Sequence, residues 1–235
     1  MFSTLLYMIP VLLIGGVIAY VFSQQQKKAT KNIDMDALRN DKKQVSQEFL
    51  DRQVPYLKEW MKGNPIDACT SATLPSNMGD FVKTAIKDTI RQSLTYNNTN
   101  TVETPAFFIL SGKELHFINT DKHSDLSEHI VFDVEKLQTA EIKFAGAKRE
   151  MGLNMSALSG QDHPKVYDIV IESDKGKSIL QAIDRIVNSS FTDTDISQMF
   201  KGGYAVDMAK AKITSEYFFE KLGEFYPNLK VEVTH

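Results

Sequence analysis

The chain lacks the means to form disulfides, because Cys69 is the one cysteine among its 235 residues. A single thiol cannot close an internal bridge, which excludes a disulfide-stabilised scaffold. A basic surplus is missing as well, since 27 basic residues stand against 30 acidic ones and the net charge is −3. Nucleic-acid-binding surfaces need positive charge to meet phosphates, so we expect no nucleic-acid partner. The 42% of hydrophobic residues is enough for a folded core and excludes a disordered chain.

Signatures of catalysis and of nucleotide binding are missing too. The sequence has no Gly-x-Ser-x-Gly nucleophile elbow, and Cys69 lies in a Ser/Thr-rich stretch without an adjacent histidine. Gly202-Gly203 lack further glycines at the spacing of a phosphate-binding loop. We therefore expect no cofactor, and the sequence favours a non-catalytic function.

Charged side chains are absent from residues 1–26. Within them, residues 5–22 form an uncharged apolar run that would span about 27 Å as a helix, close to the thickness of a bilayer core. No basic residue precedes the run and no small residues end it, which favours a retained signal anchor over a cleaved signal peptide. Lys27, Lys28 and Lys31 follow directly. By the positive-inside rule the N-terminus lies outside and the body is cytoplasmic.

Residues 27–101 have a helical pattern. Apolar residues recur at helical spacing from Leu38 to Met61, and Pro55 predicts a break into two shorter helices. Residues 67–78 are rich in turn-forming residues and predict a linker, and residues 81–94 predict a second amphipathic helix.

From residue 102 onward the pattern becomes that of β-strands. Residues 105–119 predict a hairpin whose turn is centred on Ser111-Gly112. One face of this hairpin carries Phe108, Leu110, Leu115 and Phe117, and the other carries Phe107, Ile109, His116 and Ile118. Both faces are largely apolar, so something other than water must cover each of them. We expect that either the flanking helices or another protein covers Phe107 and Ile109.

More elements are expected after the hairpin. Residues 129–134, 139–144 and 165–172 predict strands, and residues 177–188 predict a helix with an apolar stripe. The tail predicts a helix that ends before Pro227 and a short edge strand over residues 229–233.

This order of elements resembles that of pleckstrin-homology (PH) and GRAM-like domains. The residues that carry the resemblance are Phe107 to Asn119, the strands within 129–144 and the helix over 177–188. The resemblance implies a bent sheet of seven strands closed by a helix, which binds phosphoinositides in many members and proteins in others. Lipid binding in that family rests on clustered basic residues near the first strand pair. Here Glu114 follows Lys113, which makes headgroup recognition doubtful and favours a protein partner.

Histidines and acidic residues gather between residues 116 and 129. The hairpin pattern places His116 and His129 on one face, with His123 near the tip of the loop. No cysteine or carboxylate completes a recognisable zinc spacing, so no metal site is expected. Asp121, Asp125 and Glu128 do not fit the EF-hand pattern, which favours a solvated acidic loop.

The C-terminal tail is rich in aromatic residues. Packing onto the domain's own sheet is the favoured interpretation, and a partner or dimer surface is the alternative. Together with the hairpin face, the tail gives the candidate binding residues Phe107, Ile109, His116, Ile118, Tyr217, Phe218, Phe219 and Phe225.

We therefore predict an α+β protein with four parts. They are a transmembrane signal anchor (1–26), a helical region (27–101), a PH-like β domain with its closing helix (102–190) and a C-terminal helical extension (191–235). The predicted function is a membrane-tethered module that binds a protein partner or self-associates. The alternative is an anchored enzyme whose site is assembled from separated residues, with Asp121, His123 and Asp125 the first to test. A third possibility is reversed topology, which external labelling of Cys69 would support.

Overall fold

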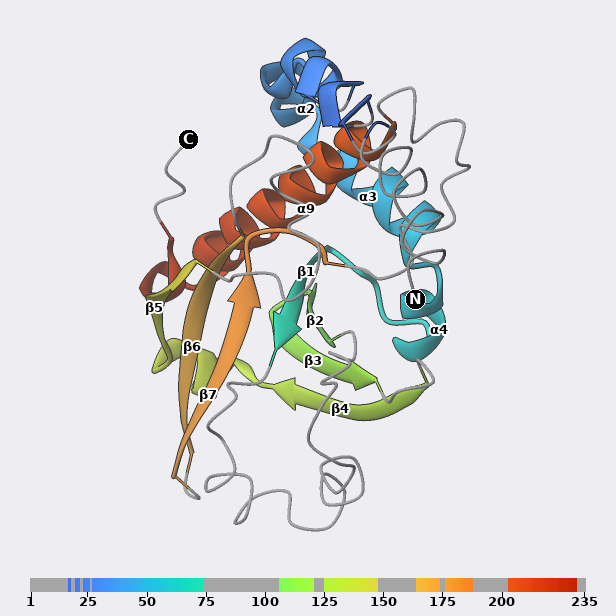
Figure 1. Cartoon of the computed structure of the whole chain (residues 1–235). Coiled ribbons are helices and arrows are strands. Elements are labelled where there is room, and N and C mark those ends of the chain that lie inside the picture. The colour runs from blue at the N-terminus through green and yellow to red at the C-terminus, as the bar shows by residue number, and fades with distance from the viewer. Residues whose placement is uncertain are drawn as a thin grey trace, which may run out of the picture.

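A computed structural model gives the fold of the chain (Figure 1). It describes residues 17, 20, 21, 23–25, 27–73, 106–120, 125–147, 164–173, 176–187 and 203–231. A seven-stranded antiparallel sheet, a long C-terminal helix that packs on it and N-terminal helices make up an α+β body. The α+β class predicted from the sequence is confirmed.

Short helices form the N-terminal part. Every described position from Val17 to Asn32 is helical, and α2 (Met35–Asn40) begins where the Asp34 side chain accepts a hydrogen bond from the Ala37 amide. After α2 come α3 (Lys42–Gln53) and α4 (Tyr56–Trp60). Pro55 stands between α3 and α4, because its ring and missing amide hydrogen are incompatible with a helix interior. The break predicted at Pro55 is confirmed.

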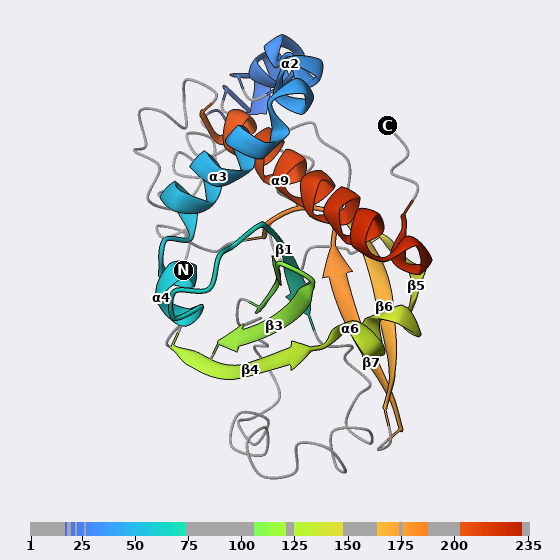
Figure 2. The ribbon, with the colours of Figure 1, turned by 180° about the vertical axis from the view of Figure 1, so that it is seen from behind.

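The strands form one sheet of order β4-β3-β2-β1-β7-β6-β5. Every pair of neighbouring strands is antiparallel. The strands are β1 (Ala68–Thr73), β2 (Ala106–Ser111), β3 (Glu114–Thr120), β4 (Leu126–Phe132), β5 (Glu141–Ala147), β6 (Lys165–Ser173) and β7 (Gly176–Ile183). β1 joins the two halves of the sheet, since it pairs with β2 on one side and β7 on the other. The short helix α6 (Val134–Gln138) connects β4 to β5, as Figure 2 shows from behind.

Residues 68–73 and 176–183 form other elements than those predicted. Residues 68–73 form β1 instead of a linker, because a strand buried on both faces needs no alternation of apolar and polar residues. Residues 176–183 form β7 instead of a helix, and β7 pairs with β6 along its whole length. The apolar spacing around Leu180 fits a helical stripe as well as a buried strand, so periodicity alone did not distinguish them.

The first hairpin turns at Gly112-Lys113, since Leu110 pairs with Leu115 and Ser111 with Glu114. Gly112 has φ of 59°, a left-handed conformation that glycine adopts without steric cost. The register is offset by two residues from the predicted one. Because strand side chains alternate with a period of two, the offset leaves both predicted faces intact.

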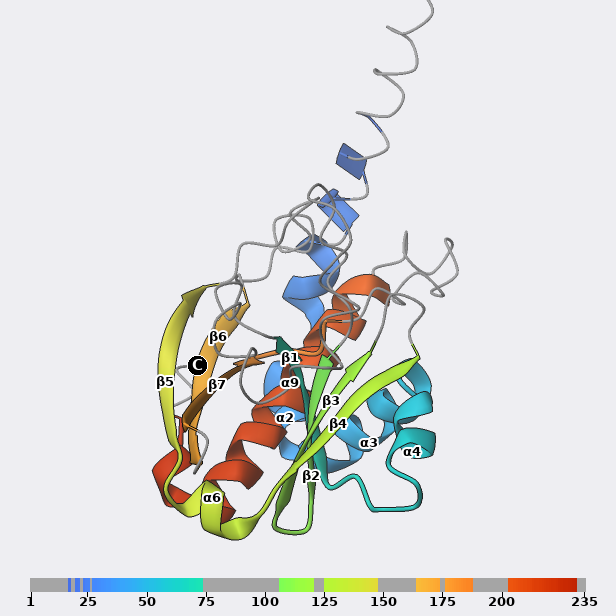
Figure 3. The ribbon, with the colours of Figure 1, turned by 90° about the horizontal axis from the view of Figure 1, so that it is seen from below.

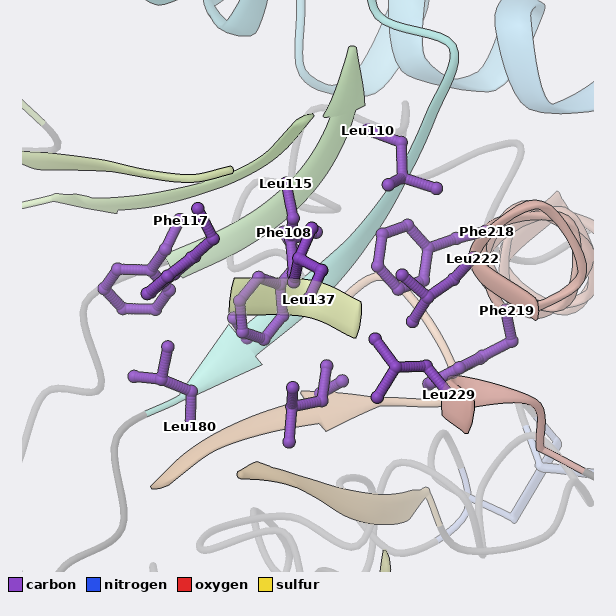
Figure 4. Packing of buried hydrophobic residues seen from close by; sticks show 14 of the residues in the cluster. Phe108, Leu110, Leu115, Phe117, Leu137, Leu180, Phe218, Phe219, Leu222 and Leu229 are labelled. Atoms are coloured by element: carbon purple, nitrogen blue, oxygen red, sulfur yellow. The ribbon is translucent and has the colours of Figure 1, made fainter. Parts of the chain in front are cut away.

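Helix α9 (Gly203–Phe225) closes the fold, followed by the 3-10 turn η3 (Pro227–Leu229). The closing helix is therefore α9 and not residues 177–188. Figure 4 shows side chains of α9 and η3 directed at Phe108 and Leu180 on the inner face of the sheet and at Leu137 of α6. The C-terminal segment is thus part of the main core. At residues 229–231, η3 and irregular backbone replace the predicted edge strand, and residues 232–233 lie outside the described residues.

A second apolar cluster lies on the outer face of the sheet, formed mainly by residues of α3, α4, β1, β2 and β3, together with Ala211 of α9. Figure 3 shows α3 and α4 on one side of β2, β3 and β4 and α9 on the other. The strands around β2 are therefore covered on both faces, as the apolar hairpin required.

The predicted membrane span, residues 5–22, lies outside the described residues except for positions 17, 20 and 21. In the described part of the chain, no helix is long and apolar enough to cross a bilayer. The helix predicted over residues 81–94 also lies outside the described residues.

Candidate functional site

The protein's own helices cover the candidate residues of the hairpin. The side chains of Phe107, Ile109 and Ile118 are fully buried and belong to the outer cluster with Phe49, Leu57 and Met61 of the N-terminal segment. The Tyr56 ring lies 6.3 Å from that of Phe107, centroid to centroid. We expected either the flanking helices or another protein to cover this face, and in the structure the flanking helices cover it. A partner can reach these residues only where the helices move away.

The aromatic tail is also occupied within the fold. Tyr217, Phe218 and Phe219 are buried in the main core, and the Phe219 ring meets Tyr167 of β6 edge-on at 5.1 Å between centroids. Of the candidate tail residues, Phe225 alone is exposed, with 36% of its surface accessible. The packing of the tail on the domain's own sheet is confirmed.

His116 and His129 form a hydrogen-bonded pair on the outer face. His116 Nδ1 lies 2.8 Å from His129 Nε2, and their rings are 5.1 Å apart between centroids. His116 is 2% exposed, whereas His129 is half-buried on the edge strand β4. The second nitrogen of His116, Nε2, makes no hydrogen bond and lies 3.6 Å from the Glu114 carboxylate. The shared face predicted for the two histidines is confirmed.

Both histidines have a pKa below the ordinary value of 6.5. Burial lowers the pKa of His116, because a charged imidazolium loses its hydration there, and the neighbouring His129 lowers it further. The Glu114 carboxylate acts in the opposite direction. Burial also lowers the pKa of His129, and the positive charge of Lys62 adds to this effect. The pair is therefore neutral at pH 7.

The acidic residues near this loop do not converge on the histidines. Glu128 lies on the opposite face of β4 from His129, and its Oε2 atom is buried without a hydrogen bond. Burial raises the pKa of the Glu128 carboxyl group. Asp125 is exposed, and Asp121 and His123 lie outside the described residues. Across the described ranges, no three His, Cys, Asp or Glu side chains are placed to hold a metal ion.

The turn of the first hairpin, where the resemblance would place a lipid site, is bound by the protein's own groups. The amide of Gly112 donates a hydrogen bond of 2.6 Å to the Asp67 carboxylate. The Tyr226 hydroxyl donates to the carbonyl oxygen of Lys113. Two carboxylates, Asp67 and Glu114, thus flank the single lysine of this turn.

Strand β5 exposes an aromatic residue that the sequence analysis did not single out. Phe144 is 63% exposed, and its ring contacts that of Tyr167 at 5.7 Å between centroids. β5 is the last strand of the sheet order, and it pairs with β6 on one side only. The alternation of Ile142 and Phe144 with polar residues predicted a strand, but only the sheet order shows that Phe144 lies at an edge.

Ion pairs fasten the N-terminal helices to α9. Arg39 binds the Glu216 carboxylate through Nε at 3.0 Å and Nη2 at 3.3 Å. Further pairs join Lys42 to Glu220 and Arg52 to Asp207. These ion pairs could not be predicted from the sequence, because each joins residues more than 150 positions apart.

Cys69 is fully buried in β1. Burial raises the pKa of its thiol well above the ordinary value. A buried, protonated thiol does not react readily with an external reagent, so thiol labelling does not distinguish the two membrane topologies in the folded protein.

Comparison of this chain with protein-family models, with curated proteins and with solved structures gave no match.

Proposed function

We propose that the protein is a membrane-tethered, PH-like module that binds an extended segment of a protein partner along strand β5. The seven-stranded antiparallel sheet with its C-terminal helix agrees with the arrangement that the PH resemblance implies. The helix that closes the sheet differs from the one expected, so the support comes from the sheet order and not from residues 177–188.

The observation that carries the proposal is the edge of β5. An edge strand has backbone N–H and C=O groups on one side that can pair with another strand. Within the described residues no second strand pairs with β5, and Phe144 of this strand is exposed. Main-chain pairing would supply affinity, and contact with the Phe144 ring would supply selectivity.

The charges near the first hairpin favour a protein over a lipid headgroup. A phosphorylated headgroup needs several cationic donors, whereas the turn offers Lys113 between Asp67 and Glu114. The carboxylates would repel phosphate, and the Lys113 carbonyl is already bound by Tyr226.

Tethering to a bilayer makes even a weak interaction effective, because it raises the local concentration of the module near other membrane-bound proteins. The helical positions that run from Val17 to Asn32 lead into α2, which the Arg39–Glu216 pair holds against α9. This arrangement would keep the body close to the membrane surface.

The test is a crosslinking pull-down of the full-length protein from intact membranes, compared with a variant that lacks residues 1–26. We expect a specific partner that is captured by the full-length chain and lost or strongly reduced without the anchor. Phe144→Ser should reduce capture at least severalfold. Val131→Ser is the matched control, since Val131 is also exposed but lies on the opposite edge strand β4.

Two results would overturn this proposal. Recovery of both the full-length chain and the shortened variant without a partner would exclude it, and so would equal capture by Phe144→Ser and the native protein. Crosslinks between copies of the chain itself would identify self-association instead.

One observation favours the alternative of an anchored enzyme. The Oε2 atom of Glu128 is buried without a hydrogen bond, and burial raises the pKa of this carboxyl group, which is the direction expected of a general acid. His129 points to the other face of β4, which separates these two groups. If the body shows hydrolase activity in a substrate screen, Glu128→Gln should abolish it, and unchanged activity in that variant would exclude Glu128 from the chemistry.

A further inference from the structure

We propose that the His116–His129 pair makes the packing of α4 and the turn after it, residues 56–66, on the outer face of β3 and β4 sensitive to pH. Acidification protonates the pair, moves this segment away and uncovers the apolar face of the first hairpin. The inference stands on the geometry of the pair and does not depend on the proposed binding at β5.

The position of the pair within the sheet is the first step of the argument. Paired positions across β1 to β4 place Cys69, Ile109, His116 and Val131 in one row, with His129 diagonal to His116. The cluster on this face contains Leu57 and Met61 from the segment 56–66, and Trp60 and Ile66 pack against it. A charge created in the pair therefore arises beside the surface that α4 covers.

The tautomer of the pair follows from its neighbours. The carboxylate of Glu114 lies near Nε2 of His116, which favours a proton on that nitrogen. The Nδ1 atom of His116 is then an acceptor, and the Nε2–H group of His129 donates to it across 2.8 Å. We assign this arrangement from the neighbouring charges. In it both histidines are neutral.

Protonation disrupts the arrangement in two steps. A proton on Nδ1 of His129 leaves the hydrogen bond intact but adds a positive charge that Lys62, two residues after the end of α4, repels. A proton on Nδ1 of His116 makes both facing nitrogens donors, so the hydrogen bond is lost. The resulting charge on His116 is almost fully buried. Moving the covering segment away admits water to the charge and separates Lys62 from His129.

The ionisable groups around the pair set the direction of the response. Glu114 favours the charged form of His116, whereas burial and the second histidine oppose it more strongly. Lys62 opposes charge on His129. Cys69, two strands away in the same row, stays protonated because burial raises the pKa of its thiol. Among the described groups, the net balance keeps the closed state neutral.

The open state takes up protons at the ordinary histidine pKa of 6.5, whereas the closed state resists them to a lower pH. Closure is therefore fully stable above about pH 6.5 and weakens as the pH falls below it. The opening equilibrium rises by up to about tenfold per pH unit for each histidine that is released, until the lower pKa of the closed state is reached.

The molecule contains its own reporter of this motion. Trp60 is the single tryptophan of the chain, lies on α4 and contacts the Tyr56 ring at 4.5 Å between centroids. The experiment follows the emission of Trp60 in the full-length protein in nanodiscs from pH 8 to pH 5. Hydrogen exchange of residues 54–66 is measured in parallel and corrected for the intrinsic rate at each pH.

We expect a reversible red shift of Trp60 emission below about pH 6.5, with exchange in residues 54–66 rising by up to about tenfold per pH unit for each released histidine. His116→Gln with His129→Gln should remove the transition. His163→Gln, which removes a histidine outside the described residues, is the matched control and should leave the transition unchanged. Lys62→Gln tests the mechanism without altering the pair. It should move the midpoint to lower pH, because Lys62 no longer repels the protonated His129 in the closed state.

Several outcomes would overturn the proposal. They are a Trp60 emission that does not change between pH 8 and pH 5, a transition that persists in the double variant, and a midpoint unmoved by Lys62→Gln. A loss of far-UV circular dichroism of the sheet in step with the emission shift would indicate global unfolding and would also contradict it.

Discussion

At the scale of single residues, buried polar groups define how the sheet and α9 fit together. The Thr70 hydroxyl of β1 donates to the carbonyl oxygen of Ile183 and lies 2.7 Å from the hydroxyl of Ser215 on α9. Strands β1 and β7 and helix α9 therefore meet at the Thr70 side chain. Both Thr70 and Ser215 are fully buried. A buried hydroxyl is stable only when its hydrogen bonds are satisfied, so Thr70 contributes to the unique docking of α9.

We predict that Thr70→Val lowers the free energy of unfolding by about 1–3 kcal/mol, because it leaves the Ser215 hydroxyl and the Ile183 carbonyl without this partner. Urea denaturation of the full-length protein in detergent, followed by circular dichroism, measures the change. Thr139→Val is the control, since the Thr139 hydroxyl is exposed and bonds only to a carbonyl of its own turn. Equal effects of the two substitutions would refute this role for Thr70.

The two candidate site residues on β4 show how a strand divides neighbouring positions. Glu128 and His129 are adjacent in sequence, yet the register with β3 directs them to opposite faces. The pattern of the sequence placed His116 and His129 on one face correctly, because alternation is a local property. It did not give their 2.8 Å contact, which depends on how β3 and β4 pair.

At the scale of elements, α9 carries contacts on two sides. Its buried residues Phe218 and Leu222 belong to the sheet core, while Ala211 belongs to the outer cluster with Phe49 of α3. The Phe218 ring lies 6.4 Å from that of Phe108 between centroids. This central position explains why the helix has little exposed aromatic surface for a partner.

We predict that Phe218→Ala destabilises the fold by about 3–5 kcal/mol, since it removes a fully buried ring and leaves a cavity between α9 and β2. Thermal denaturation should show a clear fall in the melting temperature. Phe225→Ala, on the same helix but partly exposed, should have a much smaller effect. A similar loss in both variants would contradict the assignment of Phe218 to the core.

The ion pairs between the N-terminal helices and α9 are a second feature at this scale. We predict that Glu216→Gln loosens α2, because Arg39 loses its charged partner, while global stability changes by about 1 kcal/mol or less. Limited proteolysis should then cleave faster within residues 33–41. The matched control is Glu224→Gln, whose partner Lys221 lies on α9 itself. Unchanged cleavage in Glu216→Gln would show that apolar contacts alone hold α2.

At the scale of the whole molecule, the sheet order explains which surfaces are closed and which are open. β1 lies in the middle of the sheet with helices on both sides, whereas β4 and β5 lie at its two ends. A partner that adds a strand would therefore pair with β4 or β5. β5 differs from β4 in that its exposed aromatic residue, Phe144, is more accessible than Val131 of β4.

We predict that residues 1–26 anchor the whole protein in a bilayer. After extraction of membranes with alkaline carbonate, the full-length chain should remain in the membrane pellet, and a chain without residues 1–26 should be released. The reason is that an uncharged run over residues 5–22 matches the thickness of the hydrocarbon core. Full release of the intact chain would exclude an integral anchor.

The sequence by itself determined the local features of this protein. The break at Pro55, the hairpin within residues 105–119 with its two apolar faces, and the C-terminal helix before Pro227 follow from backbone sterics and from the periodicity of apolar residues. Each of these signals acts over a few neighbouring residues, so no knowledge of distant contacts was needed.

The tertiary structure alone decided the identity of β1 and β7 and the helix that closes the sheet. β1 is short, and its small residues show no alternation, while the stripe of β7 also fits a helix. β1 is a strand because it pairs with β2 and with the distant β7, and β7 is a strand because it pairs with the neighbouring β6 as well as with β1. These pairings satisfy backbone hydrogen bonds that a buried segment cannot leave unmade. The same long-range packing buries the candidate residues of the hairpin and tail and leaves Phe144 exposed.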